Sequence, residues 1–162
     1  MFICERVYVS DWFARDVQCK EHVMEYVNKI DVVQNQIAGS FGCNIEGRFS
    51  RVRTEETNLA NITADLMRIE CNCDLAFANA GCLRANSVFP KGPFTLKTIA
   101  LIFPMPDHVV VKKIPGHILK KLLENAVSQY PKYDGRWLAT SGFKYSFDPE
   151  KPVGERIILE SL

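Results

Sequence analysis

The hydrophobic positions of the chain first repeat at helical spacing between residues 16 and 37. An apolar residue every three or four positions is typical of a helix with one buried face. Asp16 suits the N-cap, because its side chain can accept a hydrogen bond from a free backbone N–H of the first turn. We therefore predict a helix from Asp16 to about Ile37, ended by Gly39 and Gly42. Its predicted buried stripe consists of Val23, Tyr26, Val27, Ile30 and Val33.

Three further segments show the same periodicity. The residues Thr54–Asn58 begin a second predicted helix, with an apolar face of Leu59, Ile62, Leu66, Met67 and Ile69. A short helix is expected from about Thr95 to Leu101. A longer one is expected from Pro115, which suits a first helical turn, to about Tyr130; its apolar face is Ile118, Leu119, Leu122, Leu123, Ala126, Val127 and Tyr130.

Shorter apolar or alternating runs between these helices predict strands. The run from Leu75 to Ala78 reads as a fully buried strand. Other strands are expected at residues 6–10, 43–52, 107–114, 143–147 and 156–159. This order of elements predicts an α+β fold, a mixed sheet with packed helices.

The loop after the buried strand carries candidate binding chemistry. Asn79, Gly81 and Arg84 follow the carboxyl end of that strand, where sheets of α/β proteins commonly present ligand sites. Gly81 permits a positive φ or a close approach of the backbone to a ligand. The alternative is at least as well supported by the pattern: Asn79 only closes a turn, and Arg84 lies in solvent.

A second candidate lies before the helix that follows Thr54. Arg48, Arg51 and Arg53 cluster there, and a helix N-terminus beside arginines favours an anion. These arginines could equally balance the nearby carboxylates of Glu46, Glu55 and Glu56, and on the pattern alone this second interpretation is favoured.

Composition narrows the class of protein. The 162 residues are 47% hydrophobic with a net charge of +1, which permits a real core and gives no sign of a nucleic-acid-binding face. No apolar run approaches the roughly 20 residues of a membrane span. The six cysteines follow no disulfide or zinc spacing and no signal peptide precedes them, so we expect reduced thiols and a cytoplasmic location.

The chain offers no recognisable catalytic or metal-binding motif. Its three histidines, His22, His108 and His117, share no motif with one another or with aspartate. Glycine-rich phosphate-binding loops are absent as well. We therefore assign no catalytic residue, no metal ligand and no cofactor to this chain.

Several short motifs in order nevertheless resemble the 5′-nucleotidase C-terminal domain family. Residues 53–61 (RTEETNLAN), followed by Ala64-Asp65, resemble that family's R-x-x-E-[ST]-N-[LM]-G-N…A-D signature, and residues 79–84 (NAGCLR) resemble its N-G-G-x-[IL]-R loop. Residues 103–105 (FPM) are similar to its L-P-F segment, Pro115-Gly116 to the start of the following helix, and residues 141–145 to its G-[IF]-x-[VY] strand.

The resemblance implies that catalysis and substrate binding belong to separate domains. In that family a separate N-terminal metallophosphoesterase domain holds two divalent metals and the catalytic residues, and the C-terminal domain grips the nucleoside. By motif, Arg53 and Arg84 would face the phosphate and ribose, and Asn79, in the loop with Gly81, would bond the nucleoside. Met105 takes the place of a base-stacking phenylalanine, and Asp107 takes the place of an asparagine.

The sequence also departs from the family pattern. Met105 has no flat aromatic face, and Ala80 and Cys82 replace glycines. The chain ends before the family's G-G-D-G-[FY] region, which holds a second aromatic residue and a ribose-binding aspartate. We therefore expect residues 1–15 to be a connecting strand from an absent domain, and residues 16–162 to be a C-terminal domain incomplete at its own C-terminus.

Two functions remain open. The preferred one is nucleotide recognition within a 5′-nucleotidase-like hydrolase, with this chain alone inactive. The alternative is a catalytically degenerate interaction module in a larger, for example cytoskeletal, assembly. Expected partners are a nucleotide or related phosphate ester, and a metallophosphoesterase domain or another protein that covers the apolar C-terminal strand at residues 157–159.

Overall fold

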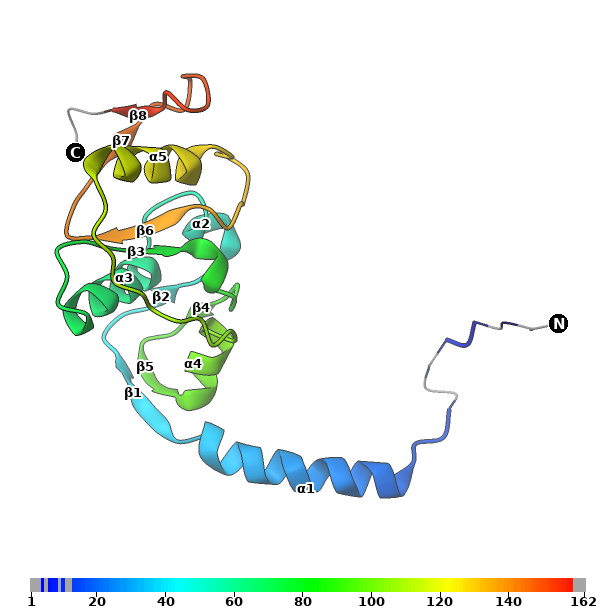
Figure 1. Ribbon diagram of the computed structural model, residues 1–162. Helices are drawn as coiled ribbons and strands as arrows, with labels where there is room; N and C mark the ends of the chain where they lie inside the picture. The colour runs from blue at the N-terminus through cyan, green and yellow to red at the C-terminus, as the bar shows by residue number, and fades with distance from the viewer. Residues whose placement is uncertain (1–3, 5, 9, 11–12, 159–162) are drawn as a thin grey trace. The chain divides into compact units, whose positions relative to one another are not determined.

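A computed structural model describes residues 4, 6–8, 10 and 13–158 (Figure 1). The chain divides into two compact units, residues 1–36 and residues 37–162. Each unit is described separately below. In the first, the described residues of the predicted strand at positions 6–10 have no regular structure, and Val9 lies outside the described residues.

The first unit contains the helix α1, Val17–Gln34. As predicted, Asp16 is its N-cap and accepts a hydrogen bond from the backbone N–H of Cys19 at 2.9 Å. The helix ends three residues before Ile37. The predicted buried stripe is wrong: no residue of α1 is buried, and Tyr26 is 62% exposed. Among the described residues of positions 1–36 there is no second helix or strand against which the stripe could pack.

The second unit is built around two antiparallel strands, β3 (Ala76–Asn79) and β6 (Leu138–Ser141), paired so that Asn79 lies opposite Leu138. Figure 1 shows this pair between the helices α3 (Asn58–Glu70) and α5 (Gly116–Val127). One core cluster involves α3 and the other involves α5. Their buried members are Ile45, Val52, Leu59, Ala60, Ala64, Leu83, Ile102 and Ala139 in the first, and Ala80, Leu123, Val127, Trp137 and Ile157 in the second.

The helix α3 buries only Leu59 of its predicted apolar face, together with small residues that the prediction left out. Its buried residues are Leu59, Ala60, Thr63 and Ala64, whereas Ile62, Leu66 and Ile69 are exposed. Small side chains let a helix approach neighbouring strands closely, and α3 packs on β3 and β6. The prediction placed the most hydrophobic residues of α3 in the core. In the structure Ala60 and Ala64 are buried instead, because their small side chains allow close packing.

The remaining strands form three more antiparallel pairs. These are β1 (Ile37–Phe41) with β5 (Gly92–Thr95), β2 (Ile45–Glu46) with β4 (Val88–Phe89), and β7 (Ser146–Phe147) with β8 (Ile157–Ile158). Small antiparallel sheets with packed helices confirm the α+β fold class. The predicted strand at 43–52 is wrong over most of its length, because only β2 forms and the short helix α2 (Phe49–Val52) follows.

The segment that links α4 (Leu96–Ile102) to α5 is irregular. Residues 103–115 form neither helix nor strand, so the predicted strand at 107–114 is wrong. A strand requires a partner for its backbone groups, and among the described residues none pairs with this segment. The predictions on either side of this segment agree with the structure more closely. The predicted helix α4 forms, and Pro115 is the N-cap of α5.

The described part of the C-terminal strand, β8, is not fully exposed to solvent. Ile157 is only 5% exposed and belongs to the second core cluster, and β8 is paired with β7. The expectation of an uncovered apolar strand is therefore wrong for Ile157. The reason is that the turn after β7 folds β8 back onto the same core as α5.

Candidate functional site

The end of β3 sets the position of the candidate loop. Asn79 is the last residue of β3, and the single 3-10 turn η1 (Ala80–Cys82) follows at once. The backbone N–H of Ala80 donates to the carbonyl of Trp137 at 2.7 Å. Leu83 is completely buried and holds the far end of the loop in the core. The predicted strand thus forms at Ala76–Asn79 and runs into a loop, but it is only partly buried: Ala76 and Ala78 are buried, Phe77 is half-buried and Asn79 is exposed.

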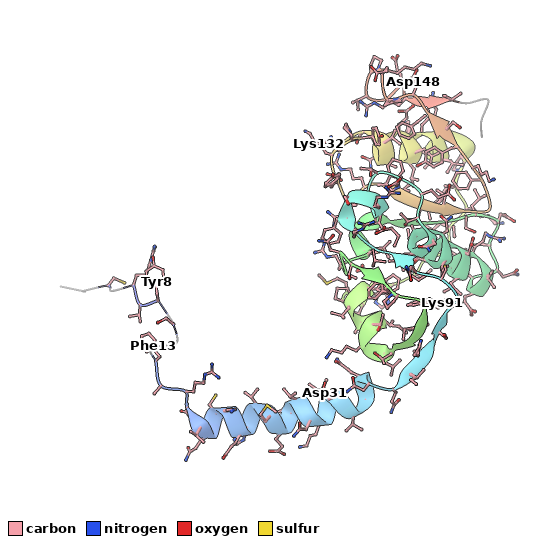
Figure 2. The ribbon with its side chains drawn as sticks, turned by 180° about the vertical axis from the view of Figure 1, so that it is seen from behind. Tyr8, Phe13, Asp31, Lys91, Lys132 and Asp148 are labelled. Carbon is pink, nitrogen blue, oxygen red and sulfur yellow. The ribbon has the colours of Figure 1, made fainter. Side chains whose placement is uncertain are left out.

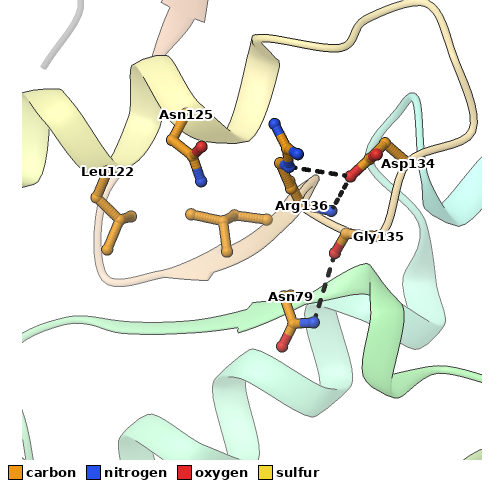
Figure 3. A pocket seen from close by; sticks show the side chains of 7 residues that line it. Asn79, Leu122, Asn125, Asp134, Gly135 and Arg136 are labelled. Atoms are coloured by element: carbon orange, nitrogen blue, oxygen red, sulfur yellow. Dashed lines mark hydrogen bonds and ion pairs between the residues drawn. The ribbon is translucent and has the colours of Figure 1, made fainter.

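One carbonyl, that of Gly135, receives two hydrogen bonds from this loop. The backbone N–H of Gly81 donates to it at 3.0 Å and the side-chain Nδ2 of Asn79 at 3.4 Å (Figure 3). A Cβ on Gly81 would lie 2.8 Å from Asn79 Nδ2, and a Cβ on Gly135 would lie 3.0 Å from the Cα of Gly81. Both glycines are needed for a close approach of two backbone segments, and Gly81 does not adopt a positive φ.

Arg84 is held by its backbone more than by its side chain. Its N–H donates to the carbonyl of Ile102 at the end of α4, at 2.9 Å. Its guanidinium is exposed and makes one long contact, 3.5 Å from Nη1 to the carbonyl of Gly81. The guanidinium carries further N–H donors, which could bind an anion.

Arg53 is the C-cap of α2 and is more enclosed than Arg84. Its guanidinium carbon lies 4.0 Å from the ring centre of Phe49, and Nη1 donates to the carbonyl of Tyr133 at 3.1 Å. Its Nε is buried and has no hydrogen-bond partner among the described residues. A buried donor without an acceptor is unusual and costs free energy unless something satisfies it.

The loop from Tyr133 to Gly135 therefore joins residues that are far apart in sequence. Through its carbonyls it contacts Arg53 in one sequence motif and Asn79 and Gly81 in the other. Figure 2 shows the neighbouring Lys132 in this connection between α5 and β6. Sequence reasoning missed the loop, since carbonyl contacts leave no trace in the side-chain pattern. The one signal in the sequence is Gly135, which on the pattern alone indicates only the end of a helix.

The other two predicted residues lie on the irregular segment after α4. Met105 is 55% exposed, and Asp107 is exposed as well. Burial raises the pKa of the Cys82 thiol, and the negative charge of Asp107 adds a little to this increase. Among the described residues, the backbones of Met105 and Asp107 form no hydrogen bond with the other predicted residues.

A cavity of about 370 Å³ opens beside Asn79 (Figure 3). It is lined by Asn79, Leu122, Asn125, Asp134, Gly135, Arg136 and Leu138. Within it Asp134 accepts from the backbone N–H of Arg136 at 2.9 Å and faces its guanidinium at 3.5 Å. Of the predicted residues, only Asn79 lines this cavity. Gly81 does not line it but donates a hydrogen bond to Gly135, which does. The sequence pattern does not single out Asn125, Asp134 or Arg136.

A second hollow of about 770 Å³ lies between the start of α3 and the segment from β6 to β7. It contains none of the predicted residues. Its lining combines Glu55, Glu56 and Asp65 with Phe143 and Tyr145, and burial raises the pKa of Tyr145 to about 12. Ser141 at its edge donates to Asp65 at 2.5 Å and accepts from Arg68 at 2.8 Å, which ties β6 to α3.

The described part of the chain shows neither a metal-binding cluster nor a membrane-spanning helix. No three His, Cys, Asp or Glu side chains there are grouped so that they could hold a metal ion. None of its helices is both long enough and apolar enough to cross a bilayer. All six cysteines are free.

Comparison with known proteins gives a consistent group. The family model described as "5'-nucleotidase, C-terminal domain" matches residues 30–161. The trifunctional nucleotide phosphoesterase protein YfkN of Bacillus subtilis is 27% identical over 145 residues, which cover 87% of this chain and 10% of that protein. The endonuclease YhcR of the same organism is 27% identical over 137 residues, covering 83% of this chain and 10% of that one.

A solved structure agrees with these sequence matches. The 5'-nucleotidase precursor from Thermus thermophilus superposes with a TM-score of 0.78 at 30% identity, over 87% of this chain and 28% of that chain. The chain thus spans about a tenth of the two Bacillus relatives and less than a third of the Thermus protein.

Proposed function

This chain belongs to the 5′-nucleotidase C-terminal domain family, and from that premise we propose that it binds the nucleotide for a larger metallophosphoesterase without performing the chemistry itself. The relatives it resembles are several times longer. The residues proposed to bind are Arg53, Asn79, Gly81, Arg84, Met105 and Asp107.

The observation that carries the proposal is the arrangement around Tyr133–Gly135. This one loop anchors Arg53 through Tyr133 and the Asn79–Gly81 turn through Gly135, and Arg84 contacts Gly81 in turn. The guanidinium of Arg53 is thereby tied to this loop directly, and that of Arg84 contacts the turn that the loop supports. A planar guanidinium matches the oxygens of a phosphate in bidentate fashion.

Asn79 is suited to the nucleoside end. Its Nδ2 is committed to the carbonyl of Gly135, which fixes the orientation of the amide. Its Oδ1 then remains to accept a hydrogen bond from an amino or hydroxyl group of a ligand. Fixing the side chain before binding reduces the conformational entropy that binding must overcome.

The base platform is weaker than the phosphate end. Met105 is exposed and offers a polarisable sulfur rather than an aromatic face. Stacking of a base on an aromatic ring is worth about 1–3 kcal/mol in single-strand binders. We therefore expect weak binding that depends on the anion and distinguishes little between bases.

The divalent metals of such hydrolases are not assigned to this chain, because its described residues offer no group of donors that fits them. We propose instead that a separate metallophosphoesterase domain holds the metals. The role left to this chain is to bind the nucleotide and present it to that domain.

Titration of the chain with AMP, UMP and inorganic phosphate, followed through the amide signals of residues 79–84, tests the binding site. We expect all three ligands to shift these signals, with similar affinities for the two nucleotides. Arg53→Ala and Arg84→Ala should each weaken binding at least about tenfold, the loss of one charge-assisted contact.

Arg51→Ala is the matched control, because Arg51 lies on the same short helix but pairs with Glu55. It should leave the affinity unchanged. Tight binding of AMP with no response to phosphate would contradict the anion-led site. No shift with any of the three ligands would exclude the proposed site altogether.

A further inference from the structure

The peptide group between Gly135 and Arg136 is held at both of its polar atoms. Its N–H, which belongs to Arg136, donates to Oδ1 of Asp134 at 2.9 Å. Its carbonyl, which belongs to Gly135, accepts from the backbone N–H of Gly81 at 3.0 Å and from Nδ2 of Asn79 at 3.4 Å (Figure 3). One peptide group thus joins the side chain of Asp134 to two residues of the proposed nucleotide site.

The two polar atoms of this peptide group are rigidly coupled. The bond between Gly135 and Arg136 is trans. A trans peptide is planar, and its N–H and C=O point in opposite directions. An acceptor that fixes the direction of the N–H therefore also fixes the direction of the carbonyl. Because Gly135 has no Cβ, its backbone could otherwise rotate with little steric hindrance, so the hydrogen bond to Asp134 selects one orientation.

The orientation of this peptide decides which atom Asn79 offers to a ligand. With the Gly135 carbonyl in front of it, Asn79 donates through Nδ2 and leaves Oδ1 to accept from the ligand. A rotated peptide would present its N–H instead, and Oδ1 would turn to accept from that. The same carbonyl holds Gly81, whose own carbonyl lies 3.5 Å from Nη1 of Arg84. The contact of Arg84 therefore depends on this peptide as well.

The hydrogen bond of Asp134 contributes more than its charge. The Asp134 side chain is 38% exposed, and Nε of Arg136 lies 3.5 Å from its Oδ1. Solvent screens an exposed ion pair of this kind. An aspartate or asparagine side chain that accepts from the backbone N–H two residues later closes an Asx turn. The longer side chain of glutamate does not suit this turn, so side-chain length and an acceptor oxygen are the properties that matter here.

We propose that Asp134 is a positioning residue of the nucleotide site. By accepting from the N–H of Arg136 it sets the direction of the Gly135 carbonyl, and through that carbonyl the geometry of Asn79 and Gly81. Asp134 itself is assigned no contact with the ligand. The role rests on the function proposed above, because the loop that Asp134 orients matters for binding only if the nucleotide binds there.

Amide proton exchange of the full 162-residue chain without ligand tests the first step. Asp134→Ala should speed the exchange of the Gly81 N–H at least about threefold, because its acceptor is no longer held in place. The side-chain amide signals of Asn79 should shift as well. Asp134→Asn keeps the acceptor oxygen of the turn and should leave both signals unchanged. Asp134→Glu keeps the charge but not the turn and should behave like Asp134→Ala.

Titration with AMP tests the second step. Asp134→Ala and Asp134→Glu should each raise the dissociation constant about threefold to tenfold, whereas Asp134→Asn should stay within about twofold of the wild type. Asp148→Ala is the matched control, because Asp148 makes the same kind of contact, accepting from the backbone N–H of Glu150 at 3.0 Å in the turn between β7 and β8. It should change neither the Gly81 signal nor the affinity for AMP.

Thermal melting of each variant shows whether it folds, and Asp134→Glu against Asp134→Asn decides the test if Asp134→Ala does not. Unchanged Gly81 exchange in the folded Ala and Glu variants would overturn the proposal. So would faster exchange with no loss of affinity in a chain whose wild type binds AMP, or an Asp134→Asn variant as impaired as Asp134→Glu. If the wild type binds neither AMP nor phosphate, the proposed function fails, and the positioning role fails with it.

Discussion

Two arginine sites in the unit of residues 37–162 differ in how their donors are used. Arg156 donates to the carbonyls of Val127 at 2.7 Å and Tyr130 at 3.2 Å, and through Nε to Lys151 at 3.2 Å. Arg53 makes one hydrogen bond and leaves a buried Nε unpaired among the described residues. Arg84 makes one contact at 3.5 Å.

The difference separates a structural role from the binding role that we propose for Arg53 and Arg84. The guanidinium of Arg156 satisfies the carbonyl of Val127, the last residue of α5, and that of Tyr130 just beyond it, and so serves the fold. Those of Arg53 and Arg84 are positioned but only partly used. Groups left unsatisfied at the expense of stability are typical of sites that await a ligand.

The largest effect is expected next to Arg156, at Glu124. This carboxylate is 8% exposed and accepts from the backbone N–H groups of Arg156 at 3.0 Å and Ile157 at 2.9 Å. Glu124→Ala would leave both donors without a partner, one of them buried. We expect the free energy of unfolding to fall by about 3 kcal/mol, measured by urea denaturation.

The exposed Glu150 supplies the control, since Glu150→Ala removes a carboxylate of the same hairpin without a buried contact. Glu124→Gln retains one acceptor oxygen and should lose less than Glu124→Ala. If Glu124→Ala were no worse than Glu150→Ala, the hairpin of β7 and β8 would not depend on α5.

This anchor shows how far the sequence could predict the fold. The helices are predictable because their signals are local, such as the N-cap at Asp16 and the proline before α5. The pairing of Glu124 with a hairpin about 30 residues further on is not, because nothing local marks a charged residue as buried. The buried face of α3 was misassigned for a related reason: Ala60 and Ala64 are selected by the strands they touch.

The site residues proposed from the sequence stay a prediction, whereas the loop that supports them was not predicted at all. The position after a buried strand located Asn79 and Arg84, and motif resemblance added Arg53. The loop that joins them could not be found, since Tyr133 and Gly135 contribute main-chain carbonyls. The strand at 107–114 failed differently: its local preference is real, but a strand forms only with a partner.

A smaller effect on stability is expected at the proposed binding arginines. Arg53→Ala loses the hydrogen bond to Tyr133 and the contact with Phe49, but it also removes an unpaired buried donor. These effects oppose each other, so we expect a change within about 1 kcal/mol in the free energy of unfolding. Arg84→Ala should change it less still. A loss equal to that of Glu124→Ala would show that Arg53 is structural.

The smallest effect concerns pH. Glu46 accepts from Arg48 Nε at 2.9 Å and from the Arg48 backbone N–H at 2.9 Å. The side-chain hydrogen bond from Arg48 is the main cause that lowers the pKa of Glu46 from 4.5 to about 2. A folded-state pKa below the unfolded one means that this contribution to stability is complete above about pH 4.5 and is lost as the pH falls towards 2.

Because the Arg48 side chain is 53% exposed, solvent and salt screen the pair and the gain is slight. Melting temperatures of the wild type and Glu46→Gln should therefore differ a little at neutral pH and converge as the pH falls towards 2, and added salt should reduce the difference. Glu70→Gln, at an exposed position at the end of α3, should show neither trend. A difference that grows as the pH falls would reverse the sign and show that the ion pair does not stabilise the folded state.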